Sequence, residues 1–540
     1  MFHSRTKLPL VLLAAGLLMK SQQTPGFRIA GQVVQHLSNR PVKGARVSIS
    51  PLTSRDRPIS CISGENGEFY FSGLAAGKYS LAVTAHGGVQ LYGQMGQYST
   101  AIAVGPGIDS EHIIFPLRSQ ASISGTVVDD AGDPVSGATV HLFVQSIENG
   151  LRQTIARSTV LTSTDGSFRF AHLAPGTYYV AVNGRPWYAQ LNALNIMTLP
   201  NQPAPPPAPA ELDVAYPVTY YGNTTSPDAA TPVKLEEGTH SQIQIMLQPV
   251  PAVHIALNGI EKSPEQQVQA TVFQRGPGGA PISIQSWTNN SVLTGIAPGD
   301  YILSTILVGP GQPPGPIGSQ AVTLSGNTTI DVNEAAETSL SGKVISDSDI
   351  PNQVAVALVD VSNGNQVAAF LGPDGSLRAF GTLAAGTYDV RLANTNEFYI
   401  QSVTVKGGEY SKGRLTVTAG AHIDLTITVA RGLTQVNGIV LRDKKPVAGA
   451  MVLAFPQDFR HGNYIPRDQS DSDGTFTLNF VAPGPYTLVA IENGDDLEYA
   501  NAAVIAPYLK AGRVIEAPLA KDARVEVEVQ PRINAKGAPQ

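Results

Sequence analysis

One stretch of sequence recurs along this chain, and it constrains the fold more than any other feature. Its clearest copy runs from Ser163 to Val182 and reads STDGSFRFAHLAPGTYYVAV. The pair Asp165-Gly166 predicts a hairpin turn, because glycine adopts positive φ without steric cost. The apolar residues that follow alternate with polar ones, as at Phe168, which predicts a strand with one buried face.

The same stretch then predicts a second turn and a second strand. Pro175-Gly176 favours a type II turn, and the alternation resumes from Tyr178. Further copies lie at residues 64–83, 372–392 and 470–490, with a worn copy at 289–305. The motif tyrosines are Tyr79, Tyr178, Tyr301, Tyr388 and Tyr486. Successive tyrosines lie roughly 90 to 120 residues apart, so each copy marks a domain and not a solenoid repeat.

These copies predict an all-β chain of about five tandem antiparallel β-sandwich domains of Ig-like or prealbumin-like type, arranged as beads on a string. The expected domains are residues 24–118, 119–250, 251–335, 336–429 and 430–530. The second domain carries an insertion rich in proline and aromatic residues at 183–222, and the third is the most degenerate copy. Residues 531–540 are expected to form a frayed tail.

The first residues have the pattern of a secretory signal peptide, which we expect to span residues 1–23. Arg5 and Lys7 precede an apolar run at 8–19 that is too short to span a bilayer comfortably. The cleavage site is poorly defined, and an uncleaved N-terminal anchor is the alternative. We therefore expect a secreted chain, in the periplasm or at the cell surface, with no transmembrane span after cleavage.

Composition excludes some functions. The net charge is −6, from 36 basic and 42 acidic residues, and lysine and arginine form no cluster. Nucleic-acid binding needs a basic patch, so no nucleic-acid partner is expected. Cys61 is the only cysteine, which excludes an intramolecular disulfide, and we expect it to be a small, inert side chain.

The order of the motifs is similar to that of a known family. A first strand is followed by Pro-Val-x-Gly-Ala-x-Val, as at residues 134–140 and 446–452, and then by the recurring stretch. This arrangement resembles the carboxypeptidase regulatory-like domain, a transthyretin-like sandwich that is grouped with carbohydrate-binding-like folds. Residues 127–182 and 440–489 carry the resemblance best. It implies seven-stranded sandwiches that are appended to other domains or strung together in secreted bacterial proteins, and it implies no particular activity.

The motif residues are expected to be structural: the apolar side chains would pack the sandwich cores, and the tyrosines would form tyrosine corners whose hydroxyls bind upstream backbone. The structural set is Gly166, Phe168, Phe170, Leu173, Pro175, Gly176, Tyr178, Tyr79, Tyr301, Tyr388, Gly474, Phe476, Gly484 and Tyr486.

The chain lacks the signatures of common enzymes. It has no His-x-x-Glu zinc motif, no Gly-x-Ser-x-Gly elbow and no phosphate-binding loop, so we expect no catalysis, no cofactor and no metal. The segment Asp471-Ser472-Asp473-Gly474 could begin a calcium loop. No acidic residue follows at the twelfth position, where an EF-hand places its bidentate glutamate, and a hairpin turn is the favoured interpretation.

The best candidate for a binding site is the insertion of the second domain, where aromatic residues concentrate. They are Trp187, Tyr188, Tyr216, Tyr220 and Tyr221. Their rings either stack on sugar faces or anchor a long proline-rich loop to its own sandwich.

We therefore expect a non-catalytic, secreted, multidomain binding or scaffold protein that binds carbohydrate or cell-envelope polysaccharide. The alternative is a protein-interaction stalk, or an accessory module for a peptidase or envelope complex on another chain. Exposed aromatic rings in the insertion would favour sugar, and buried rings with exposed strand edges would favour a protein partner.

Overall fold

The computed structural model describes residues 26–533, apart from 55, 86–87, 190–208, 210, 260–265, 289–291, 310–311, 333–338, 352–353, 362–363, 365, 373, 381–382, 384, 460 and 521–522. The predicted signal peptide, the middle of the predicted insertion and the end of the predicted tail lie outside the described residues. The described chain is almost entirely β-structure and forms tandem sandwiches, which confirms the predicted fold class.

The strands group into five units, which we number in chain order. Unit one contains β1 (Phe27–Gln35), β2 (Arg46–Pro51), β3 (Ile59–Ile62), β4 (Glu68–Leu74), β5 (Gly77–Ala85), β6 (Gly88–Leu91), β7 (Ile102–Val104) and β8 (Ile113–Leu117). Unit two contains β9 (Ala121–Val128), β10 (Thr139–Glu148), β11 (Leu151–Leu161), β12 (Ser167–Leu173), β13 (Gly176–Asn183), β14 (Val214–Ala215), β15 (Thr219–Tyr220), the 3-10 helix η1 (Pro227–Ala229), β16 (Val233–Leu235) and β17 (His240–Met246). The short strand β18 (Val250–Pro251) pairs with β14 and leads into unit three.

Units three to five continue the series. Unit three contains β19 (Val253–Asn258), β20 (Gln267–Arg275), η2 (Pro277–Gly279), β21 (Pro281–Thr288), β22 (Val292–Ile296), β23 (Gly299–Gly309), β24 (Gln312–Leu324) and β25 (Thr328–Asp331). Unit four contains β26 (Ser339–Ile345), β27 (Ala355–Asp360), β28 (Gln366–Leu371), β29 (Leu377–Phe380), β30 (Gly386–Ala393), β31 (Phe398–Lys406), β32 (Glu409–Ser411), β33 (Arg414–Val417) and β34 (His422–Arg431). Unit five contains β35 (Thr434–Arg442), β36 (Lys445–Pro446), β37 (Met451–Pro456), β38 (Arg467–Gln469), β39 (Thr475–Val481), β40 (Gly484–Ile491), α2 (Ala502–Leu509), β41 (Arg513–Ala517) and β42 (Val525–Gln530).

Each unit encloses its own apolar core. In unit two, the sheet β12-β9-β17 packs on the sheet β11-β10-β13-β15, and unit one repeats this order with β4-β1-β8 and β3-β2-β5-β6. Most neighbouring strands are antiparallel, but β9 pairs in parallel with β17, as β1 does with β8. Because the first and last strands of a unit run in the same direction, the chain enters the unit at one end and leaves it at the opposite end. This pairing places successive units end to end.

The motif residues lie in the cores. Phe168 and Phe170 are 5% and 4% exposed, and their ring centroids lie 6.0 Å apart in an edge-to-face arrangement. The hydroxyl of Tyr178 donates to the carbonyl oxygen of Ala174 at 2.8 Å. The same bond, four residues upstream, joins Tyr79 to Ala75 and Tyr301 to Ala297. Even the degenerate third copy therefore retains its tyrosine bond.

We expect Tyr178→Phe to lower the free energy of unfolding of unit two by about 0.5–1.5 kcal/mol, because the part-buried hydrogen bond from the Tyr178 hydroxyl to the Ala174 carbonyl is lost. Differential scanning calorimetry checks the value. Tyr70→Phe, at a ring that is 63% exposed, is the control and should leave the melting temperature unchanged. Equal melting temperatures for wild type and Tyr178→Phe would contradict the structural role of the hydroxyl.

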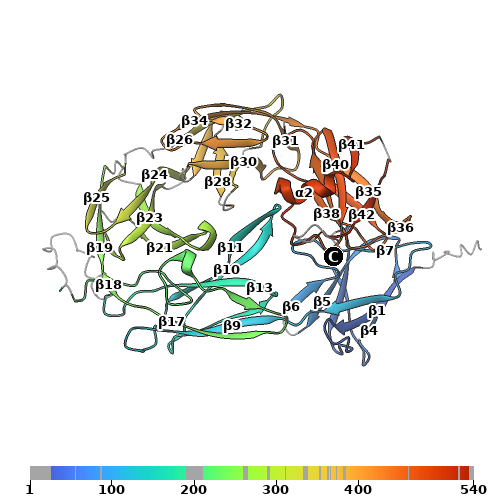
Figure 1. Cartoon of the computed structure of the whole chain (residues 1–540), viewed down its shortest axis with the longest axis horizontal. Helices are drawn as coiled ribbons and strands as arrows, with labels where there is room; N and C mark the ends of the chain where they lie inside the picture. Colours follow the sequence, from blue (N-terminus) through green and yellow to red (C-terminus); the bar gives the residue numbers. More distant parts are fainter. Residues whose placement is uncertain are drawn as a thin grey trace, which may run out of the picture.

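The five units follow one another around a ring, and unit five returns to unit one (Figure 1). The hairpin of β10 and β11 extends from unit two into the middle of this ring (Figure 1). Near its tip, Gly150 accepts a hydrogen bond from the backbone N–H of Ala500, at 3.0 Å, and Arg152 pairs with Glu498, at 2.8 Å. The hairpin thus joins unit two directly to unit five.

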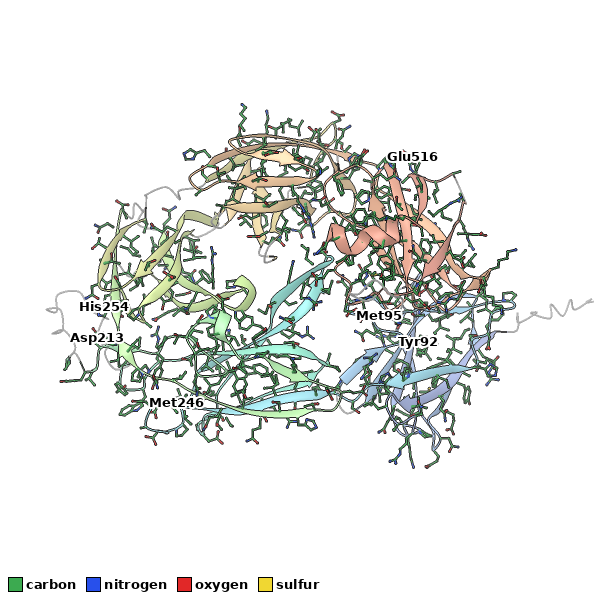
Figure 2. All side chains as sticks on the ribbon, viewed as in Figure 1. Tyr92, Met95, Asp213, Met246, His254 and Glu516 are labelled. Atoms are coloured by element: carbon green, nitrogen blue, oxygen red, sulfur yellow. The ribbon has the colours of Figure 1, made fainter. Side chains whose placement is uncertain are left out.

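Neighbouring units are also held together by side chains. Figure 2 labels Asp213 and His254, which form an ion pair between the insertion of unit two and the first strand of unit three, with Oδ2 and Nε2 2.8 Å apart. A shared apolar cluster that includes Phe143, Tyr220 and Ile282 also spans these two units. Neighbouring units therefore pack on one another.

Candidate functional site

The predicted aromatic site is only partly at the surface. Trp187 is 73% exposed, and its ring packs edge-to-face on the half-buried Tyr188, with centroids 5.6 Å apart. These two residues follow β13, where the chain leaves the sheet for the insertion. They form a small aromatic surface that a ligand can reach.

The other three predicted rings belong to the interior. Tyr216 and Tyr220 are 6% and 0% exposed, and Tyr221 packs against the core of unit two. Burial, together with the nearby carboxylate of Asp129, raises the pKa of Tyr216 to about 12. Tyr216 and Tyr220 are therefore not available to stack on a sugar. They anchor the end of the insertion, because β15 pairs with β13 and brings Tyr220 into the sheet.

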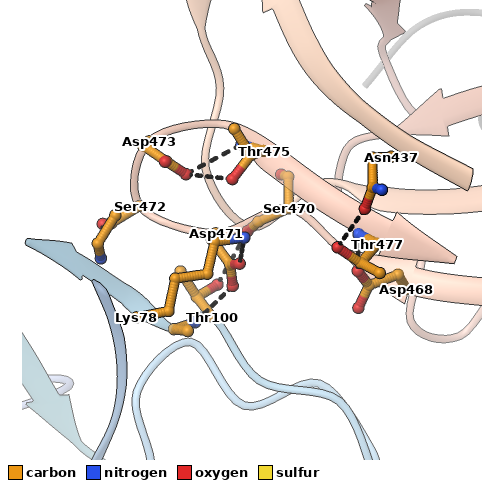
Figure 3. A network of polar contacts seen from close by, with 12 residues as sticks. Lys78, Thr100, Asn437, Asp468, Ser470, Asp471, Ser472, Asp473, Thr475 and Thr477 are labelled. Carbon is orange, nitrogen blue, oxygen red and sulfur yellow. Dashed lines mark hydrogen bonds and ion pairs between the residues drawn. The ribbon is translucent and has the colours of Figure 1, made fainter. Parts of the chain in front are cut away.

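The most elaborate polar site lies where unit five meets unit one, and Figure 3 shows it. Asp471 lies two residues after the end of β38, and its side chain is 12% exposed. Its Oδ2 accepts a hydrogen bond from Nζ of Lys78 on β5, and its Oδ1 accepts one from the backbone N–H of Ala101 at 2.8 Å. One carboxylate in unit five thus binds a side chain and a backbone group of unit one.

Neighbouring residues extend this junction. The backbone N–H of Ser472 donates to the carbonyl oxygen of Ala101 at 2.9 Å. The side-chain amide of Gln469 donates to Oγ1 of Thr100 at 2.8 Å, and both residues are almost fully buried. Of the Gln469 amide, the oxygen Oε1 has no hydrogen-bond partner among the described residues. The other contacts named above make the interface specific in geometry, because a shifted register would leave their donors and acceptors unpaired as well. We refer to residues 469–472 of unit five, with Lys78, Thr100 and Ala101 of unit one, as the ring junction.

The segment once open to a calcium interpretation is therefore a hairpin turn and part of this junction. Oδ1 of Asp473 accepts hydrogen bonds from the backbone N–H and the hydroxyl of Thr475, and Gly474 takes φ +77 in the turn. Throughout the described part of the chain, no group of three or more His, Cys, Asp or Glu residues is placed to hold a metal ion.

The ring junction was missed at the sequence level, although one signal was present. In unit two the turn Asp165-Gly166 is preceded by Ser163, whose hydroxyl binds Asp165 locally. Unit five has Asp471 at the position of Ser163, in addition to the turn residue Asp473. A second carboxylate with no local partner indicates a partner elsewhere in the fold.

Asp471 in the ring junction and Asp468, just before it on β38, are two acids that make stability depend on pH. Burial raises the pKa of Asp468 and of Asp471 above the usual 3.8, and for Asp471 the ion pair with Lys78 opposes this shift. Each group therefore binds a proton more readily in the folded chain than in the unfolded chain. Their contribution to stability is fully present below pH 3.8 and is lost as the pH rises through the raised pKa values.

We expect Asp468→Asn to flatten the fall of stability as the pH rises above 3.8, because an amide has no proton to lose in this range. Its oxygen can still accept the bond from the backbone N–H of Thr477, which is 2.7 Å long in the wild type. Urea unfolding at several pH values checks this. The exposed Asp130→Asn is the control, and an unchanged slope in Asp468→Asn would refute the assignment.

The single cysteine is not part of these sites. Cys61 is a free thiol in β3, half-buried against the core of unit one. Burial raises the pKa of its thiol, which disfavours the reactive thiolate. Within the described residues, no helix is long and apolar enough to cross a membrane.

Comparison with known proteins identifies two of the units. Residues 28–101 and 122–203, which lie mainly in units one and two, match the model of the carboxypeptidase regulatory-like domain. A comparison with curated proteins gives no match.

Solved structures with partial similarity include two bacterial pilins and the TIE protein of Bacillus anthracis. The minor pilin GBS52 of Streptococcus agalactiae is 14% identical, with 44% of this chain and 98% of that chain covered and a TM-score of 0.20. The shaft pilin SpaA of Lactobacillus rhamnosus GG is 10% identical, with 42% and 98% covered and a TM-score of 0.19. The TIE protein of Bacillus anthracis is 12% identical, with 76% and 69% covered and a TM-score of 0.16. At TM-scores this low, no property of these proteins is transferred to this chain.

Proposed function

We propose that this chain is a non-catalytic, exported scaffold whose five sandwiches act together as a closed ring. Its regulatory-like domains support a role in binding over one in catalysis. Export rests on the predicted signal peptide at residues 1–23, which the structure does not describe.

The observation that carries this proposal is the ring junction. A stalk needs contacts only between consecutive units, whereas Lys78 and Asp471 join the first unit to the last. The hairpin of β10 and β11 adds a second connection across the ring. Such a closed arrangement holds binding surfaces on different units at fixed positions, which lowers the conformational entropy lost when a large partner binds.

We propose envelope polysaccharide as the ligand of the scaffold, with Trp187 and Tyr188 as one contact surface. Flat aromatic faces suit the apolar faces of sugar rings, and Trp187 is freely accessible.

A protein partner is the second candidate, and a specific observation favours it. The edge strand β3 of unit one exposes Ile59 and Ile62, and Tyr70 on β4 is exposed beside them. An accessory role for a peptidase or envelope complex on another chain belongs to this second candidate.

Binding of the purified chain to a panel of soluble and insoluble polysaccharides tests the choice of ligand. We expect wild type to bind and the double variant Trp187→Ala/Tyr188→Ala to bind less, with Tyr70→Ala as an exposed-aromatic control that binds normally. Binding by none of the polysaccharides would reject the carbohydrate proposal and leave the protein partner. In that case, Tyr70→Ala and the Ile59→Ser/Ile62→Ser variant become the relevant probes in partner capture.

A further inference from the structure

A cavity of about 290 Å³ lies between units four and five, away from Trp187 and from the ring junction. Unit four contributes the end of β30 and the start of β31. Unit five contributes the segment after β37 and the turn between β39 and β40. Ligand sites occur often between domains, and this volume is near the lower end of the range of about 300–1,000 Å³ for small-molecule pockets. It suits one or two rings and excludes a long chain.

The walls of the cavity are fixed by bonds between the two units. His461 of unit five donates from Nδ1 to the carbonyl oxygen of Ile400 in unit four, at 2.7 Å. The amide of Asn463 donates to Oδ1 of the buried Asp389 at 2.9 Å. The ring of His461 also packs edge-to-face on Tyr399, with centroids 5.0 Å apart. The cavity is therefore preorganised and not a gap between loosely joined domains.

Phe480, which lines the cavity, has an unusual backbone conformation. Its φ is +57, in the left-handed region that bulky residues rarely adopt, and its side chain is 46% exposed. The same bulge occurs in other units, where Gly73 and Gly295 take φ +74 and +72 and His172 takes φ +58. Two sister units thus have glycine at this position, and a third has a larger side chain in the same left-handed backbone. In unit five the side chain at this position is an aromatic ring that lines the cavity and remains accessible.

The cavity has a second accessible ring and polar groups of both signs. Tyr464 is 47% exposed and lines the cavity together with Asp458 and Arg391. The Arg391 guanidinium is paired with Asp389 at 3.2 Å, and its Nε has no hydrogen-bond partner among the described residues. Asp389 also pairs with Arg414, at 3.1 Å, and the lining itself carries the carboxylate of Asp458 as well as the guanidinium of Arg391. The cavity therefore presents charges of both signs and is not built for an anion or a cation alone. Its lining can donate and accept hydrogen bonds around apolar faces.

We propose that this cavity binds a neutral sugar ring, a free saccharide or the end of a glycan chain. A pyranose has apolar C–H faces for Phe480 and Tyr464, and its hydroxyls both donate and accept hydrogen bonds. Asp458 offers acceptors, and Arg391 and Tyr464 offer donors. This inference rests on the proposed carbohydrate role and places a sugar site at the seam of units four and five.

Isothermal titration of the purified chain with neutral monosaccharides and disaccharides of glucose, galactose, mannose and N-acetylglucosamine tests the proposal. We expect at least one of them to bind, and Phe480→Gly to weaken binding tenfold or more. Glycine suits the φ of this position, so the variant should melt at or above the wild-type temperature, and a loss of binding cannot be attributed to unfolding. Tyr464→Ala is the second variant, and it should also weaken binding.

Trp187→Ala is the matched control, because it removes an exposed aromatic ring far from the cavity. It should bind the small sugars as wild type does. If Trp187→Ala loses binding and Phe480→Gly keeps it, the cavity is not the site, whereas the carbohydrate role stands. If no sugar of the panel binds wild type, the cavity proposal is overturned, and the polysaccharide panel then decides the carbohydrate role independently.

Discussion

Replacement of Lys78 by methionine is expected to open the ring. Methionine has a similar length but no charge, so the carboxylate of Asp471 would remain in the junction without its ion-pair partner. Leaving a buried charge unpaired costs about 3–5 kcal/mol. Because Lys78 is 31% exposed, solvent screening reduces this to roughly 1–3 kcal/mol. We expect this loss of free energy in the closed form of the ring, with little change in the stability of the core of unit one or unit five.

The effect should depend on pH in a defined direction. The pKa of Asp471 is already raised by burial, and loss of Lys78 raises it further. As the pH falls, Asp471 takes up a proton and the unpaired charge disappears, so the difference between Lys78→Met and wild type should shrink. Lys78→Arg, which keeps the charge, is the control. A difference that stays constant or grows on acidification would contradict the role of this ion pair.

Substitution of Gly125 by alanine is expected to give the largest local loss of stability. A Cβ atom at this position would lie 2.3 Å from the carbonyl oxygen of Ile243 on β17 and 2.8 Å from the ring of Phe168. Both neighbours are fixed, one by the parallel pairing of β9 with β17 and one by the core. Overpacking of this kind costs about 1–3 kcal/mol and sometimes more. We expect about 3 kcal/mol, measured by calorimetry as a shift of the unit-two transition.

Gly176→Ala is the matched control within unit two. Its Cβ would make only an ordinary contact, 3.6 Å from the ring of Tyr178, and its φ lies outside the left-handed region. This variant should melt within a degree or two of wild type. Equal losses of stability for Gly125→Ala and Gly176→Ala would mean that the close approach of β17 to β9 does not limit the size of the side chain at position 125.

Much of the fold was predictable because its signals are local. The hairpin turn at Asp165-Gly166 and the alternation of Phe168 and Phe170 are set by residues next to one another, and the structure has both. The parallel pairing of β9 with β17 was not predictable in this way. It joins strands separated by the whole length of a unit, and no turn residue specifies it.

The candidate sites were less predictable, for a physical reason. An aromatic ring has the same apolar area whether it packs in a core or binds a ligand at the surface. Composition alone therefore cannot predict that Trp187 is exposed and Tyr220 is buried. Pairing of Tyr220 with β13 decides its burial. The contact between Lys78 and Asp471 joins residues that are 393 positions apart. The only sequence signal for it is that Asp471 is a second acid beside the turn residue Asp473.

Small-angle X-ray scattering of the purified chain at neutral pH tests the closed ring most directly. We expect a maximum dimension that matches the ring of Figure 1, and an increase in this dimension for Lys78→Met. An extended particle several units long for the wild type, with the same profile for Lys78→Met, would contradict the closed ring and leave a string of independent sandwiches.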